Sequence, residues 1–104
     1  MDSATGTIAR PALEVPPPTG AAHVASWEQD QPMPSRSFFG VPRGLSGRTP
    51  VVGTAGHQWA DGSIESGASI DIIGLRDGLS SGQARELASA LLEAADEVDE
   101  WLSR

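Results

Sequence analysis

The last quarter of the chain has the features of one long amphipathic helix. Ser80 and Gln83 have the spacing of a capping box, in which the serine hydroxyl accepts a backbone N–H and the glutamine side chain bonds back to the cap. Beyond this point, apolar residues recur every three or four positions, so they share one side of a helix. The sequence therefore predicts a helix over about residues 80–102 with one buried stripe. That stripe consists of Ala84, Leu87, Ala88, Leu91, Ala95, Val98 and Leu102.

A β-hairpin is predicted over about residues 51–73. Asp61-Gly62 is a dipeptide typical of a two-residue hairpin turn, in which both central residues need positive φ. This turn would place Trp59 opposite Ile64, and it sorts the residues of both strands onto two faces. The face expected to be buried carries Val51, Gly53, Ala55, His57, Trp59, Ile64, Ser66, Ala68, Ile70 and Ile72. The face expected to meet solvent includes Val52, Thr54, Gly56 and Gln58.

The rest of the chain is less regular. Residues 1–22 are rich in Pro, Ala, Thr and Gly, and Pro16-Pro17-Pro18 favours polyproline II, so we expect a disordered Pro-rich tail before a domain over residues 23–104. Residues 37–41 contain two phenylalanines and are expected to form a short strand, whereas residues 42–50 have the Pro and Gly content of a loop.

These elements predict an α+β fold in which a small antiparallel sheet packs against one long C-terminal helix. A hairpin and a helix alone, about fifty residues, make a core that is only marginally stable in isolation. The strand at residues 37–41 would enlarge the sheet to three strands or more. A homodimer formed through the sheet edge or the helix would also enlarge the core. Both remain open at this point.

Charge limits the kinds of partner. The net charge is −7, and it arises in residues 51–104, which hold three Arg and ten Asp or Glu. An acidic domain repels nucleic acid and anionic membranes, so the expected partner is a protein with a basic or apolar surface. The chain has no Cys, no leader-like start and no apolar run long enough to span a bilayer. We therefore expect a cytoplasmic protein that does not bind membranes.

The first candidate site is the acidic end of the helix. Negative charge is unfavourable near a helix C-terminus, and like charges four residues apart repel each other. This local cost suggests a function, with Trp101 as an aromatic anchor that docks on a basic patch of another protein. The alternative is a solvated acidic helix end that aids solubility. The candidate partner-binding residues are Glu93, Glu97, Glu100 and Trp101. Replacing the three glutamates by glutamine is expected to stabilise the helix slightly. The leading function is accordingly a small acidic, non-enzymatic interaction module.

The alternative function is a regulator that associates with nucleic acid. Arg36, Arg43 and Arg48 lie close in sequence to Phe38 and Phe39. Arginine binds phosphate and phenylalanine stacks on bases in many proteins that hold single strands. The acidic second half of the chain argues against this interpretation.

One pair of residues has the chemistry of a catalytic base and its orienting carboxylate, namely His57 and Asp61. The structural interpretation, a partly buried histidine and a turn aspartate, is favoured. His23 is the second of two histidines, and two isolated imidazoles make a poor metal site. We therefore expect no enzyme activity, no metal and no cofactor.

The C-terminal half resembles a group of proteins. The run GLSSGQARELA at residues 78–88, followed by LLEAADE at residues 91–97, is similar to the C-terminal part of small proteins of actinobacteria and their bacteriophages. The resemblance covers about residues 51–102 and implies a strand-turn-strand before the helix. It implies an actinobacterial or phage origin and no particular activity.

Overall fold

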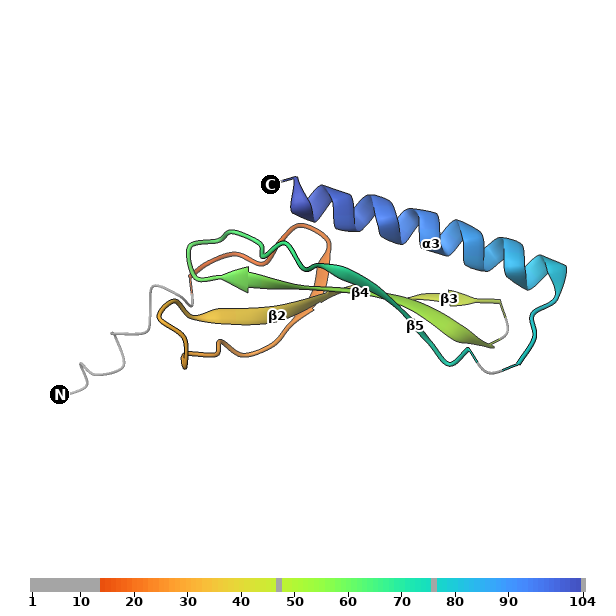
Figure 1. The fold of residues 1–104 in the computed structure, drawn as a ribbon, viewed down its shortest axis with the longest axis horizontal. Helices are drawn as coiled ribbons and strands as arrows, with labels where there is room; N and C mark the ends of the chain where they lie inside the picture. Colours follow the sequence, from red (N-terminus) through yellow and green to blue (C-terminus); the bar gives the residue numbers. More distant parts are fainter. Residues whose placement is uncertain (1–13, 47, 76, 104) are drawn as a thin grey trace.

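The computed structural model describes residues 14–46, 48–75 and 77–103. In this part of the chain, five strands form one antiparallel sheet, and one long helix follows them (Figure 1). The predicted α+β fold is thus confirmed. The elements are β1 (Ala21–Val24), β2 (Ser35–Gly40), β3 (Arg43–Leu45), β4 (Arg48–Trp59), β5 (Ser69–Ile73) and α3 (Ser81–Leu102).

The twelve-residue strand β4 is the centre of the sheet. One edge of β4 pairs with β2 near its C-terminal end and with β3 near its N-terminal end. Its other edge pairs with β5, and β1 pairs with the outer edge of β2. The predicted strand around Phe38 is present as β2, and the five strands agree with the expected sheet of three strands or more.

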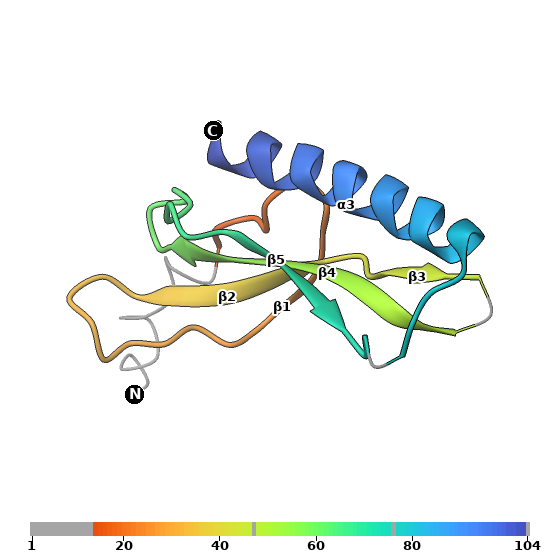
Figure 2. The same cartoon turned by 45° about the vertical axis from the view of Figure 1, so that its right-hand side comes forward.

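Side chains alternate between the two faces of the sheet, as strand geometry requires. On the face toward α3, every second residue of β4 is buried. Figures 1 and 2 show α3 lying along this face, with its N-terminal end near β3 and its C-terminal end near β2. The buried β4 residues are Pro50, Val52, Thr54, Gly56 and Gln58.

The core has two parts joined through Ile70. Phe38, Val98 and Trp101 form one cluster, in which the phenylalanine and indole rings meet edge-on with centroids 4.8 Å apart. In the other cluster, Val52 packs with Ala90 and Ala94 of α3. Ile70 contacts both clusters. Edge-to-face aromatic pairs add to the free energy of burial.

The predicted helix and its cap are confirmed. Ser80 Oγ accepts a hydrogen bond from Gln83 N at 3.1 Å, and Gln83 Oε1 accepts one from Ser80 N at 3.0 Å. The predicted stripe is only partly buried, because the helix is rotated toward the β3 side. The buried residues of α3 are Ala90, Ala94, Val98 and Trp101. Ala84, Ala88 and Leu102 of the predicted stripe are exposed.

The hairpin is present, but its predicted register is wrong by one residue. Thr54 lies opposite Ile70 and Val52 lies opposite Ile72. Because side chains alternate along a strand, this slip exchanges the two faces of β4. The face that the sequence predicted to be buried, with Val51, Gly53, Ala55 and His57, is the face away from α3.

The turn explains why the two faces of β4 are exchanged. Trp59 N donates to Ser63 O at 2.8 Å, so the loop holds three residues rather than two. Gly62 has a φ of 92°, whereas Asp61 does not adopt positive φ. A three-residue loop of this kind places one glycine in the left-handed region, and here it sets Gln58 opposite Ile64.

Between Ile64 and Ser69 the second strand slips by two further residues in the opposite direction, so that Val52 lies opposite Ile72. A slip of two residues leaves the faces unchanged, so the loop length decides which face of β4 is inside.

The domain begins earlier than predicted. The carbonyls of Val15 and Pro16 accept hydrogen bonds from Arg36 and Gln58, and Thr19 O accepts one from the Trp101 indole. Residues 14–22 are therefore part of the domain, and the boundary at residue 22 is wrong. The earlier part of the expected disordered tail lies outside the described residues. The loop expected at residues 42–50 instead contains β3 and the start of β4.

Adding one methyl group at Gly56 should destabilise the fold. A Cβ there would lie 2.6 Å from Phe38 Cζ, inside the first core cluster. We expect Gly56→Ala to lower the free energy of unfolding by about 1–3 kcal/mol, measured by urea denaturation. Gly44→Ala is the matched control, because a Cβ on this β3 glycine meets nothing within 4 Å. Equal losses in both variants would contradict the proposed packing.

Candidate functional site

Residues of the candidate partner site and of the candidate nucleic-acid site contact each other. Arg43 of β3 reaches the acidic side of α3, where its Nε lies 3.3 Å from Glu93 Oε1 and its Nη1 lies 3.4 Å from Glu97 Oε1. Glu97 Oε1 also accepts a hydrogen bond of 2.8 Å from the hydroxyl of Thr54. An arginine assigned to nucleic acid and two glutamates assigned to a protein partner thus bind each other.

Gly40 makes room for this contact. A Cβ on Gly40 would collide with Thr54 Oγ1 and with the carboxylate of Glu97. The carboxylate therefore lies directly over the sheet, and the Glu97 side chain is 17% exposed, against 69% for Glu93. Arg43 lies between these two acids, so it offsets the like-charge repulsion that the helix would otherwise have.

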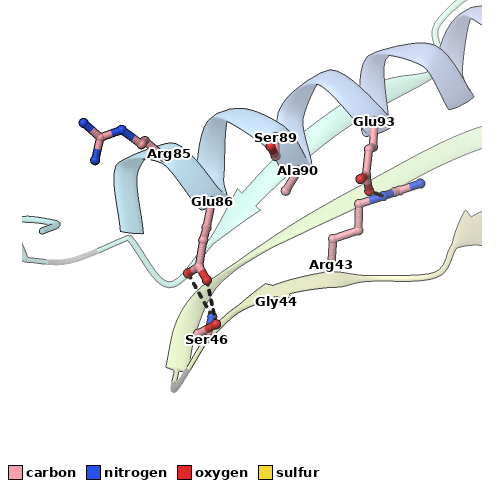
Figure 3. A pocket seen from close by; sticks show the side chains of 8 residues that line it. All are labelled: Arg43, Gly44, Ser46, Arg85, Glu86, Ser89, Ala90 and Glu93. Atoms are coloured by element: carbon pink, nitrogen blue, oxygen red, sulfur yellow. Dashed lines mark hydrogen bonds and ion pairs between the residues drawn. The ribbon is translucent and has the colours of Figure 1, made fainter. Parts of the chain in front are cut away.

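A shallow groove of about 390 Å³ continues from this contact along β3 and α3 (Figure 3). At its far end, Glu86 accepts hydrogen bonds from Ser46 N and Ser46 Oγ, at 3.2 Å and 2.6 Å. The Arg85 side chain points away from these groups. The carboxylates that line the groove are thus bound to β3. We interpret the groove as the seam that fixes the helix on the sheet.

Two other candidate residues are placed differently from their expected roles. Trp101 is fully buried in the core, so it does not anchor an outside protein. Arg36 is also buried; its Nε donates to Gln58 Oε1 at 2.9 Å, and its guanidinium lies over the Trp27 ring. Arg48 is the first residue of β4 and pairs with Leu45. Of the arginines proposed for nucleic acid, Arg36 and Arg43 therefore face the protein interior or its own acids.

His57 and Asp61 do not form the pair considered from the sequence. The His57 ring lies 3.4 Å from the hydroxyl of Ser37 on the neighbouring strand. Asp61 binds within its own loop, where it accepts hydrogen bonds from Ser63 N at 2.9 Å and Ser63 Oγ at 2.6 Å. These bonds lower the pKa of Asp61 below its ordinary value. Asp61 thus acts as a turn residue.

The face of the sheet away from α3 is the surface that the sequence interpretation missed. We call it the open face. Phe39 and Ile73 are 41% and 60% exposed on it, and no helix lies on this side in Figures 1 and 2. Its residues are His23, Ser37, Phe39, Val51, Gly53, Ala55, His57, Ser69, Asp71 and Ile73. The odd-numbered positions of β4 would have indicated this face if the loop length had been known.

The described residues contain no group of three or more His, Cys, Asp or Glu side chains gathered as for a metal ion. Over the same ranges, no helix combines the length and the apolar character that a bilayer crossing needs.

Comparisons with known proteins add no family. Neither a scan of protein-family models, nor a search of curated proteins, nor a search of solved structures found a significant match to this chain.

The contacts of Glu97 with Arg43 and Thr54 predict a further effect on stability. Glu97→Ala leaves the Thr54 hydroxyl and part of Arg43 without an acceptor, and we expect it to cost about 1–3 kcal/mol in urea denaturation. Glu93→Ala removes an exposed ion pair on the same helix and should change stability by about 0.5 kcal/mol or less. A gain in stability from Glu97→Ala would instead support the interpretation that the acidic helix end is merely repulsive.

The hairpin loop that contains Asp61 predicts an effect of pH on stability. Because the pKa of Asp61 is lowered in the folded state, its hydrogen bonds stabilise the fold above the unfolded-state pKa, and this contribution is lost as pH falls through the folded-state pKa. Ser63→Ala should raise the pKa of Asp61 in an NMR titration of the carboxyl group. His57→Ala should leave that pKa unchanged. A shift in the histidine variant would show that the two side chains interact after all.

Proposed function

We propose that this protein is a small acidic, non-enzymatic interaction module that binds a protein partner through the open face of its sheet. One observation supports this most directly. A face of the sheet that carries exposed Phe39 and Ile73 is left without a covering layer in the described part of the chain. Exposed apolar patches on soluble proteins commonly mark interaction sites.

Charge distribution supports the same surface. The protein has a net charge of −7, yet among the open-face residues only Asp71 carries a negative charge. Solvated sheet faces are usually rich in charged side chains. Here the acids gather on α3, and part of them is neutralised by Arg43. A surface kept free of like charge suits a partner that covers it.

The shape of the open face suggests how a partner would bind. Ala55 of β4 and the neighbouring Gly67 line a shallow depression, which the side chain of Phe39 borders. A partner residue could enter this depression while Phe39 contributes the larger apolar area. Aromatic residues are typical of the sites that dominate interface energy. The overall negative charge favours a partner whose surrounding surface is basic.

The biological setting is part of the proposal. The resemblance of residues 51–102 to small actinobacterial and phage proteins suggests a cytoplasmic partner in an actinobacterial cell. The nucleic-acid alternative receives less support, because Arg36 is buried and Arg43 is paired with Glu93 and Glu97. We therefore do not propose nucleic acid as the ligand.

The proposal is tested with the full chain, tagged and incubated with nuclease-treated actinobacterial lysate. We expect a protein that is retained at a fixed ratio by the wild type. Phe39→Asp places a charge in the centre of the open face and should reduce the retained amount about tenfold or more.

Leu92→Asp is the matched control, since Leu92 is exposed on α3 and this helix covers the opposite face of the sheet. This variant should retain the partner like the wild type. Loss of the partner in the Leu92 variant but not in the Phe39 variant would move the docking surface to the helix. Partners that disappear with nuclease would restore the nucleic-acid alternative.

A further inference from the structure

β5 has one edge without a neighbouring strand. It pairs with β4 on one side, and no strand of the described chain pairs with its other side. Its sequence, SIDII, has no Pro or Lys, which commonly block free edges, and Asp71 is its one charged residue. The main-chain N–H and C=O groups of this edge are therefore available to a further antiparallel strand.

The flank of α3 on the β5 side is mostly apolar, with Asp99 at its outer border. Glu86, Glu93 and Glu97 lie on the opposite flank, where they contact β3. Since β3 and β5 pair with opposite edges of β4, the other flank of the helix faces β5. Helix geometry assigns five apolar residues of the predicted stripe to this flank. They are Ala84, Ala88, Leu91, Ala95 and Leu102.

Ile72 connects the free edge to this flank. It lies opposite Val52 on the α3 side of the sheet, yet it is 42% exposed because no strand or side chain closes the space beyond β5. Leu91 and Ile70 pack against the same core cluster, which confirms that this flank turns toward β5. An open strand edge and an exposed apolar strip thus lie side by side.

We propose that a second copy of this chain covers the free edge of β5, so that two sheets join into one across a two-fold axis. In this dimer, β5 pairs antiparallel with its equivalent, and Ile72 lies opposite Ile72 of the other copy. The two α3 helices lie on the same side of the joined sheet, and their apolar flanks face each other.

The charges favour a second copy in this register. Pairing centred on Ile72 sets Asp71 opposite Ile73 of the other copy, so the two aspartates do not face each other directly. The glutamates that contact β3 lie on the outer flanks of the two helices, away from the two-fold axis. Two chains of charge −7 can therefore associate through a surface that holds few acids. A two-fold interface requires such self-complementarity.

This inference goes beyond the proposed function and uses a different surface. Because the axis is perpendicular to the sheet, both open faces lie on the same side of the dimer. The dimer would then present two equivalent docking faces to its partner, which raises the effective affinity for a partner with repeated sites.

The first test is sedimentation of the full chain over a range of concentrations. We expect a dimer in the wild type, and Ile72→Lys should weaken it about tenfold or more. Ile73→Lys is the matched control, because Ile73 is the next residue and lies on the open face. In the proposed register the new lysine meets Asp71 of the other copy, so this variant should dimerise at least as well as the wild type.

A second test does not depend on weakening the dimer. The chain has no Cys, so Ile72→Cys introduces a single thiol. Directly opposite residues of antiparallel strands are close enough for a disulfide. Mild oxidation should give a covalent dimer from Ile72→Cys and little from Ile73→Cys. Circular dichroism of each variant confirms that it is folded.

Several outcomes would overturn the dimer. A wild type that sediments as a monomer at all concentrations would do so, as would cross-linking through position 73 in preference to position 72. Dissociation by Ile73→Lys alone would assign the dimer to the open face.

Loss of partner binding in Phe39→Asp without a change in sedimentation would separate the docking face from the dimer.

Discussion

The ring of Phe38 lies against Gly56 of the neighbouring strand and meets the indole of Trp101 edge-on, and this contact joins the sheet to the helix. It determines which face of β4 is inside. It also draws Trp101 inward, where its indole N–H donates to Thr19 O at 2.8 Å and ties the N-terminal segment to the domain. The same burial removes Trp101 from the outer surface, so a partner has to bind elsewhere.

The parts of the fold that depend on neighbouring residues could be predicted from the sequence. Ser80 and Gln83 specify the start of α3 through bonds within four residues, and the apolar repeat specifies its extent. The hairpin register could not be predicted, because it depends on whether Asp61 adopts positive φ. A loop longer by one residue exchanges inside and outside along the whole of β4.

The candidate site was limited in another way. The apolar stripe of α3 is wider than the face that the sheet covers, and contacts with distant residues decide which half is buried. Arg43 and Thr54 draw Glu97 toward the sheet from 54 and 43 positions away, respectively. The apolar periodicity of the helix does not depend on either residue, so it could not predict these contacts. The sequence therefore identified charged groups that matter for the structure but assigned them to outside partners.

The docking face and the dimer both depend on which face of β4 is exposed. One measurement tests this directly. A soluble paramagnetic agent broadens the NMR signals of methyl groups near solvent, and it can be added to the full chain at low concentration. The structure predicts strong broadening for Ile73 on the open face. It predicts protection for Val52 and Ala94, which are buried between the sheet and the helix. Protection of Ile73 together with broadening of Val52 would contradict the register, the open face and the proposals built on them.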